Sequence, residues 1–196
     1  MNKVYGVGIN DCSCKTVRYE RENGVWKRTG YYKAYSTWVK ILRRCYIDNE
    51  YHNDVDVSED WKKFSNFENW YIKNYEEGYE VDKDILGCSI YSSTTCLMIP
   101  KWLNNKLRKV RHTETGVWYD KTRHKYQAYC TNFNGVKVNL GRFNSFDDAK
   151  LEWAKAKADF IDAVIENNNF KSPVVDGLLK LKNDLLTLNN LNRGSK

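Results

Sequence analysis

Apolar residues along the chain recur at two different spacings, which predict helices in some segments and strands in others. Residues 37–46 and 60–78 carry apolar side chains three and four positions apart, the spacing of one face of a helix. Ser36 is the expected N-cap of the first helix. Gly78 is expected to end the second helix, whose aromatic face should pack in a core.

Shorter extended segments predict strands on either side of these helices. Alternation around Asn23-Gly24 predicts a β-hairpin over residues 17–32. Residues 82–86 and 90–92 predict two further short strands, and a proline then precedes a helix expected over residues 101–109.

From residue 115 the pattern changes to three strands and a long helix. Residues 116–120, 125–131 and 135–143 alternate between apolar and polar side chains, with turn residues between them. Ser145 is expected to cap a helix over residues 146–166, with two aspartates in its first turn. The predicted fold class is α+β: a ββα module with extra helices, a three-stranded antiparallel sheet packed on one helix, and a C-terminal helix.

These elements predict that the chain is divided into three parts: a module over residues 1–110, a second domain over residues 111–168, and a C-terminal helix with its tail over residues 169–196. Leucines recur at helical spacing in the last segment, at Leu178, Leu181, Leu185 and Leu188. Folding back onto the body of the protein is the expected use of this stripe, and self-association is the alternative.

Charge concentrates in one part of the chain. The net charge is +7. Nine basic side chains and two acidic ones stand between Lys106 and Arg142, so this stretch accounts for the whole excess. A solvated basic face is the simpler explanation of any such run. Aromatic and amide side chains interleaved with the charges favour a polyanion as partner, most simply nucleic acid.

Strand alternation sharpens this expectation. If Tyr126, Ala128 and Cys130 face the helix, the residues between them face outward together with polar residues of the other strands. Lys and Arg neutralise phosphates, while Arg, Gln and Asn form paired hydrogen bonds with base edges. The predicted contacts to double-stranded DNA are Arg108, Lys109, Arg111, Trp118, Arg123, Lys125, Gln127, Tyr129, Lys137, Asn139 and Arg142.

The six cysteines and the lack of long apolar runs bear on the compartment. No apolar run approaches the roughly 20 residues of a membrane span, and the N-terminus lacks the apolar core of a signal peptide. A cytoplasmic protein with reduced thiols is therefore expected. Cys12, Cys14, Cys88 and Cys96 could form a zinc site, but they lack paired C-x-x-C spacing, so scattered buried thiols are favoured.

Three motifs in the second half of the chain occur together in a known domain. They are the Gly-Val pair at residues 116–117, the aromatic-x-Ala of Tyr126 to Ala128, and Leu140-Gly141-x-Phe143 ahead of an alanine-rich helix. The segment closely resembles the APETALA-type DNA-binding domain, known in plant regulators and in phage endonucleases and integrases. The resemblance implies that the sheet, rather than the helix, enters the major groove.

The first half carries a second set of motifs. They are GVGIND at residues 6–11, Arg44-Cys45-Tyr46, the aromatic run from Trp61 to Trp70, and the block from Asp82 to Asn104. Together they resemble phage-encoded homing-endonuclease-like proteins of the HNH (His-Me finger) superfamily. The resemblance implies an infected bacterial cell as the setting. It also implies a β-hairpin and helix around one divalent metal ion, with a histidine as general base.

This chain departs from that pattern at the catalytic histidine. Lys83 and Asp84 stand where the histidine is expected, and Gly87-Cys88 replaces a Gly-Asn pair. On a strand, Asp82 and Asp84 would project to one side and Lys83 to the other. With the amide of Asn104 on the following helix, the two carboxylates would offer Mg²⁺ or Mn²⁺ oxygen ligands. The expected catalytic residues are thus Asp82, Lys83, Asp84 and Asn104.

Three functions are consistent with these patterns. The first is sequence-directed binding of double-stranded DNA coupled to metal-dependent cleavage, as in homing endonucleases. The second is a catalytically inactive DNA-binding protein that acts as a regulator or as an inhibitor of a host nucleic-acid-processing or defence system. The third is a basic adaptor for an acidic protein, because charge alone does not name the polyanion.

Overall fold

The protein has an α+β fold divided into two compact units. The computed structural model describes residues 3–12, 16–48, 55–111 and 116–191. The first unit comprises Met1–Asp84 and Cys88–Met98, and the second comprises Ile85–Gly87 and Ile99–Lys196. The units thus divide at residue 98, whereas the pattern of motifs places a boundary at residue 110. No helix among the described residues is long and apolar enough to cross a membrane.

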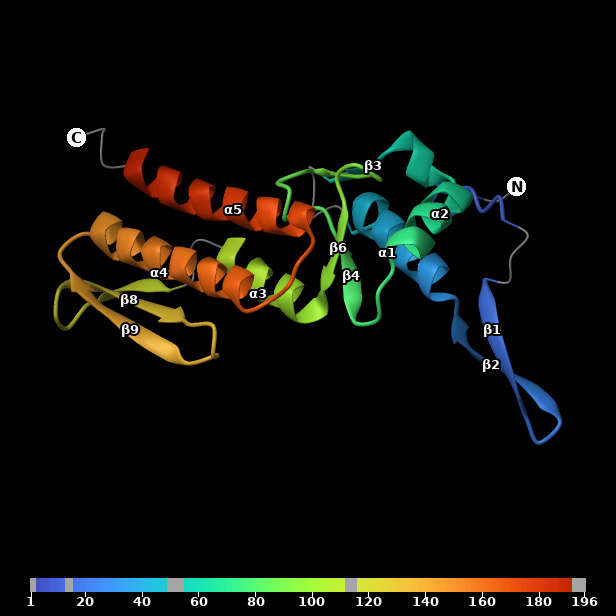
Figure 1. Cartoon of the computed structure of the whole chain (residues 1–196), viewed down its shortest axis with the longest axis horizontal. Helices are drawn as coiled ribbons and strands as arrows, with labels where there is room; N and C mark the ends of the chain where they lie inside the picture. Colours follow the sequence, from blue (N-terminus) through green and yellow to red (C-terminus); the bar gives the residue numbers. More distant parts are fainter. Residues whose placement is uncertain (1–2, 13–15, 49–54, 112–115, 192–196) are drawn as a thin grey trace. The chain divides into compact units, whose positions relative to one another are not determined.

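The first unit combines two helices with short strands (Figure 1). Its elements are β1 (Val17–Glu22), β2 (Val25–Tyr31), α1 (Lys33–Tyr46), β3 (Asp56–Val57), the 3-10 helix η2 (Glu59–Lys62), α2 (Phe64–Asn74), β4 (Tyr79–Asp82), β5 (Ile90–Tyr91) and the beginning of β6 (Leu97–Pro100). β1 and β2 form the predicted hairpin. Asn23 and Gly24 both have positive φ at its turn, as a type I′ turn requires.

Aromatic side chains form the core of this unit, as the helical spacing predicts. Trp38 of α1, Trp61 of η2 and Phe64 of α2 are fully buried, and the indole nitrogen of Trp38 donates a hydrogen bond to the carbonyl of Trp61 over 2.7 Å. The rings of Trp61 and Phe67 meet edge to face with centroids 4.9 Å apart. These contacts hold α1 against α2 and η2.

The predicted start of the first helix is wrong, and so are both ends of the second, whereas the first helix ends at Tyr46 as predicted. α1 begins at Lys33, so Ser36 lies inside the first turn and donates its hydroxyl hydrogen bond to the carbonyl of Lys33 rather than capping the helix. The second predicted helix is broken at Lys63 into η2 and α2. Gly78 lies beyond the end of α2, in the turn before β4. Apolar spacing continues through the break because both pieces face one core.

The predicted hairpin of residues 82–86 with residues 90–92 does not form. β4 ends at Asp82, and residues 83–87 form a bend and turn in which Gly87 has a positive φ. β5 pairs in parallel with β3, whereas β4 pairs with β6. The two segments were expected to pair because they follow each other in the chain. Pairing of β5 with β3 instead lets the side chain of Tyr91 reach the core.

The second unit holds the three-stranded sheet and three helices. Its elements are α3 (Lys101–Arg111), β7 (Val117–Asp120), β8 (Lys125–Thr131), β9 (Lys137–Phe143), α4 (Phe146–Glu166) and α5 (Ser172–Leu191). The sheet is antiparallel in the order β7-β8-β9, as predicted. α4 lies between the sheet and α5 (Figure 1). Ser145 caps α4 as expected, because its hydroxyl accepts a 3.0 Å hydrogen bond from the amide of Asp148.

The C-terminal helix folds back onto the second unit. α5 begins at Ser172, within the segment 169–196 predicted to hold it, and packs along α4. Leu178 and Leu185 of the leucine stripe are buried there. On the surface of the helix pair, Lys182 forms an ion pair with Asp162 over 2.6 Å.

Candidate functional site

One face of the three-stranded sheet carries the residues predicted to contact DNA. Cross-strand pairing places Trp118 of β7, Gln127 of β8 and Arg142 of β9 in one row. Directly paired residues project to the same face. On the opposite face Ala128 and Cys130 are buried on the side of α4, in agreement with the predicted alternation.

Aromatic rings and a lysine form a stacked cluster on this outer face. The rings of Trp118 and Tyr129 are nearly parallel, with centroids 4.7 Å apart and an angle of 5° between their planes. The ammonium group of Lys137 lies 4.5 Å from the centre of the Tyr129 ring and 5.5 Å from that of Trp118. The cluster therefore presents a flat apolar surface next to a positive charge.

The predicted base-reading amides are engaged within the protein. Gln127 is only 6% exposed, and its amide donates a 2.8 Å hydrogen bond to the hydroxyl of Tyr129. The side-chain oxygen of Asn139 accepts a hydrogen bond from the backbone amide of Gly141. Here a register shift between strands gives Gly141 a positive φ. Both amides are therefore engaged in hydrogen bonds within the sheet.

Two of the predicted cations are likewise held by neighbours. Arg123 forms an ion pair with Asp120 over 3.1 Å within the turn after β7. Lys125 donates a hydrogen bond to the side-chain oxygen of Asn144. Arg142 is exposed and forms no ion pair with any residue that the structure describes. Lys137 and Arg142 are thus the sheet cations best placed to meet an anionic partner.

The remaining basic candidates lie at the end of α3. The backbones of Arg108, Lys109 and Arg111 are helical, but their side chains fall outside the described part of the structure. They remain sequence predictions.

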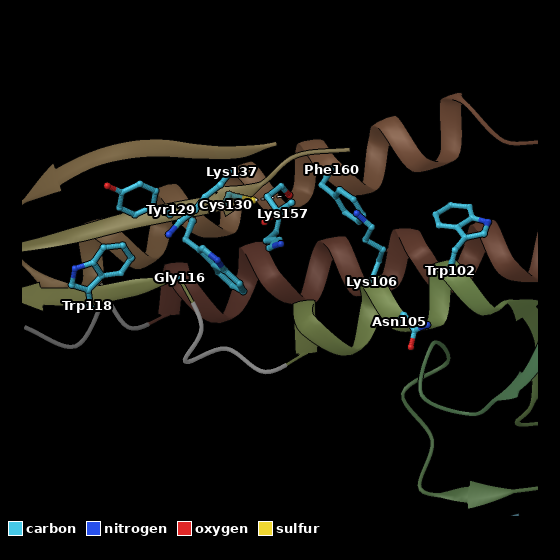
Figure 2. Close-up of a pocket in the computed structure, with 12 residues that line it drawn as sticks. Trp102, Asn105, Lys106, Gly116, Trp118, Tyr129, Cys130, Lys137, Lys157 and Phe160 are labelled. Atoms are coloured by element: carbon cyan, nitrogen blue, oxygen red, sulfur yellow. Dashed lines mark hydrogen bonds between the residues drawn. The ribbon is translucent and has the colours of Figure 1, made fainter. Parts of the chain in front are cut away.

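A pocket of about 770 Å³ lies beside the sheet in the second unit. It is lined from three directions, by α3, by α4 and by the β7 and β8 end of the sheet (Figure 2). β8 continues to Thr131, beyond the start of β7, and this leaves its edge open to the pocket. Gly116 forms part of the wall, where a Cβ atom would lie 2.3 Å from the indole nitrogen of Trp153.

Lys157 is a buried cation in this pocket that the motif analysis did not select. It is 8% exposed, and its ammonium group lies 5.8 Å from the ring centre of Trp153 and 5.6 Å from that of Phe160. Burial raises the pKa of the Cys130 thiol, although the charge and hydrogen bond of Lys157 lower it. The helical spacing of Trp153, Lys157 and Phe160 is the sequence feature that indicates that Lys157 lies on the same face of α4 as the two buried rings.

The predicted catalytic residues of the first unit form a charged cluster at the end of β4, in which Lys83 and Asp84 form an ion pair. Lys83 is only 6% exposed. Its ammonium group donates to the carboxylate of Asp84 and to the carbonyl of Cys88, and it lies 5.5 Å from the ring centre of Tyr91. The prediction that Lys83 points away from the aspartates is wrong for Asp84, because the chain turns after Asp82 instead of continuing as a strand.

Burial dominates the electrostatics around this cluster. It raises the pKa of Tyr91 to about 12, although Arg44, which donates a 3.2 Å hydrogen bond to the Tyr91 hydroxyl, lowers it. It also raises the pKa of Cys96 to about 12 and that of Cys45 to about 11. At neutral pH these three side chains are therefore protonated.

The fit of a divalent metal to this cluster is limited by Lys83. Asp82 is 3% exposed and Asp84 is partly exposed, but the ammonium group of Lys83 already neutralises the Asp84 carboxylate. Among the described residues, no three His, Cys, Asp or Glu side chains gather as metal ligands do. Asn104, the third predicted ligand, lies on α3 in the other unit.

The other side chains considered for metal binding are dispersed. Cys12 donates a 3.2 Å hydrogen bond to Glu68, Cys88 is partly buried, and Cys96 is buried. None of the three forms a disulfide bond within the described part of the chain. Cys14, the fourth candidate zinc ligand, lies outside the described residues.

Comparisons of this chain with protein-family models, with curated proteins and with solved structures give no match. Its function therefore has to be argued from the geometry of its own residues.

Proposed function

We propose that this protein binds double-stranded DNA through the outer face of its three-stranded sheet. The observation that carries the proposal is the combination of Lys137 and Arg142 with the stacked rings of Trp118 and Tyr129 on one sheet face. The cations attract phosphates and release counterions. A ribbon of antiparallel strands has the width that the major groove admits.

The residues of this face are suited to different contacts with DNA. Arg142 extends from the row of Trp118 and Gln127, and arginine can form two hydrogen bonds with a guanine edge. Lys137 lies over the aromatic cluster, where its charge favours a phosphate. Gln127 and Asn139 hold the surface in shape. Sequence reading is therefore assigned to Arg142 and backbone contact to Lys137.

Equilibrium binding of a labelled duplex tests the proposal. In a pool of duplexes enriched on the wild-type protein, Arg142→Ala should lose about 1–3 kcal/mol of discrimination at one base position. Lys137→Ala should weaken binding to all sequences about equally. Lys155→Ala is the matched control, because Lys155 is an exposed cation of α4 that pairs with Glu152. Equal affinity of all three variants and the wild type would refute the assignment.

A second candidate function adds cleavage of the DNA. The observation that favours it is the chain order: two paired strands, β4 and β6, with Asp82 and Asp84 at the end of the first, are followed directly by α3. Asp82 and Asp84 are the residues of the first unit that would hold Mg²⁺ or Mn²⁺. The ion would stabilise charge on the cleaved phosphate. A divalent ion would have to compete with Lys83 for Asp84, which favours binding without cleavage.

Plasmid nicking separates the two candidates. An active site predicts nicking that requires Mg²⁺ or Mn²⁺ and is lost in Asp84→Ala, while duplex affinity is retained. Absence of nicking in either metal, together with tight binding that weakens with salt, would select a DNA-binding regulator or an inhibitor of a host system. Binding to an acidic protein but not to duplex would select the adaptor function. Each activity is expected in the cytoplasm, where DNA is accessible.

A further inference from the structure

The pocket of the second unit has the composition of a ligand site. Its volume of about 770 Å³ falls within the range of roughly 300–1,000 Å³ that is usual for small-molecule sites. Five of its twelve described lining residues are aromatic and three are lysines. The described lining residues are Trp102, Asn105, Lys106, Gly116, Trp118, Tyr129, Cys130, Thr131, Lys137, Trp153, Lys157 and Phe160.

The charges of the pocket select the class of ligand. Lys106, Lys137 and Lys157 line it, and no carboxylate does among the lining residues that the structure describes. Lys157 is more than nine-tenths buried, and no described carboxylate forms an ion pair with it. Its contacts within the protein are a hydrogen bond with the Cys130 thiol and the rings of Trp153 and Phe160, none of which is an anion. These contacts offset part of the cost of burying an ammonium group, but none neutralises its charge. A ligand that carries negative charge would complete the site.

The rings select a flat ligand. Trp102 is 42% exposed on α3, and Trp118 is equally exposed on the sheet. Figure 2 shows Trp118 and Trp102 at opposite ends of the row of lining side chains, with Lys157 between them. Exposed indole rings beside lysines bind nucleobases by stacking while the cations bind the phosphate. Asn105 adds an amide able to donate to and accept from a base edge.

We infer that this pocket binds a single unpaired nucleotide, with its base among the aromatic rings and its phosphate near Lys106 and Lys157. Trp118, Tyr129 and Lys137 line the pocket and also belong to the outer face of the sheet. The inference thus deepens the proposed DNA binding and rests on it for the source of the nucleotide. A free nucleoside monophosphate has the same chemistry and is the other source.

Three ligands distinguish these sources: a blunt duplex, the same duplex with one unpaired nucleotide bulged from its centre, and each nucleoside monophosphate alone. For the wild type we expect the bulged duplex to bind at least fivefold more tightly than the blunt one, since stacking one base is worth about that much or more. Quenching of tryptophan fluorescence should accompany binding, because three of the lining residues are tryptophans.

Variants confined to the pocket separate it from the sheet face. Lys106→Ala, Trp102→Ala and Lys157→Met should each remove most of the preference for the bulge and leave affinity for the blunt duplex within twofold. The matched controls are Lys155→Met, an exposed lysine of the same helix as Lys157, and Tyr119→Ala, an aromatic residue of β7 that is 45% exposed and outside the pocket lining. Circular dichroism confirms folding, and the two α3 variants keep the test valid if Lys157→Met does not fold.

Each outcome decides one of the two proposals. Loss of the bulge preference in the pocket variants alone supports the inference with DNA as the source. Monophosphate binding that the same variants abolish supports it with a free nucleotide as the source. It is overturned if the wild type neither prefers the bulge nor binds a monophosphate, or if either property survives in all three variants. Failure to bind either duplex refutes the proposed function, and the monophosphate titration then decides the pocket.

Discussion

At the scale of single residues, the side chain that departs most from expectation is Lys83. A lysine is rarely buried unless it is paired. Here the Asp84 carboxylate, the Cys88 carbonyl and the Tyr91 ring surround its ammonium group. This set of contacts explains how a charge can be buried in the first unit without a metal ion, and it assigns Asp84 a structural role whether or not the site is catalytic.

Asp84→Asn should lower the free energy of unfolding of the protein by about 1–3 kcal/mol, because it leaves Lys83 buried without its anionic partner. Urea denaturation followed by tryptophan fluorescence measures the change. Glu77→Gln is the control: it breaks the exposed Lys33–Glu77 ion pair, where both side chains are more than half exposed, and should cost less than about 1 kcal/mol. Equal effects of the two substitutions would mean that Lys83 is solvated.

Three buried acids of the first unit predict a loss of stability at alkaline pH. Burial raises the pKa values of Cys45 to about 11 and of Cys96 and Tyr91 to about 12 in the folded protein. The unfolded chain therefore loses these protons first. Their contribution is fully present below pH 9 and is lost as the pH rises toward the folded values.

The free energy of unfolding should thus fall by about 4–5 kcal/mol between pH 8 and pH 10.5, with roughly 2 kcal/mol from each cysteine and about 1 kcal/mol from Tyr91. Urea titrations at several pH values measure it. Cys96→Ala should flatten this dependence, although it also lowers stability at pH 8. A dependence that is the same in the variant and in the wild type would show that Cys96 does not contribute.

At the scale of elements, Gly116 determines how β7 approaches α4. Its φ is +132°, and a Cβ there would lie 2.3 Å from the Trp153 indole and 2.7 Å from the Tyr129 carbonyl. Gly116→Ala should therefore lower the free energy of unfolding by about 2–4 kcal/mol, through backbone strain and overpacking.

Gly135→Ala separates these two causes. Gly135 also has a positive φ, but a Cβ there meets no atom within 4 Å, so the strain alone should cost about 1–2 kcal/mol. Thermal unfolding of both variants measures the difference. If Gly116→Ala lowers the free energy of unfolding no more than Gly135→Ala does, the Trp153 side chain can move away, and the wall of the pocket can rearrange.

Elements with strong local signals could be predicted from the sequence, and those that depend on distant partners could not. Ser145 and the two following aspartates identify the start of α4, and Asn23-Gly24 identifies the first hairpin, because caps and turns depend on adjacent residues. The parallel pairing of β3 with β5 joins segments 34 positions apart, Asp56 to Ile90, and no local rule specifies it. The end of β4 at Asp82 was also missed, because β4 pairs with β6 and not with the segment directly after the turn.

The same division applies to the candidate site. Alternation along β8 gave the outer face of the sheet correctly, because period two is a property of any strand. It could not reveal that Gln127 bonds to Tyr129, since that depends on side-chain rotamers. The pocket draws residues from α3, the sheet and α4, so only tertiary structure brings Trp102 near the same cavity as Lys157.

At the scale of the whole molecule, the positive charge excess predicts how binding responds to salt. The net charge is +7, yet in the sheet region Arg123 is already paired with Asp120, and Lys125 donates to the amide oxygen of Asn144. Counterion release depends on the cations that meet phosphates rather than on the net charge. The slope of log affinity against log salt concentration should therefore reflect unpaired cations such as Lys137 and exclude those held by carboxylates.

Lys137→Ala should make this slope shallower by about 0.9, the value for one phosphate contact on duplex DNA. Arg123→Ala should change it by much less, because the guanidinium and the Asp120 carboxylate neutralise each other 3.1 Å apart. Fluorescence anisotropy of one labelled duplex measures both slopes. The titration covers about 50 to 300 mM KCl, the range over which phosphate contacts weaken. A larger change for Arg123→Ala would place the DNA on the β7–β8 turn, at the far end of β8 from Lys137, and would move the interface away from the aromatic cluster.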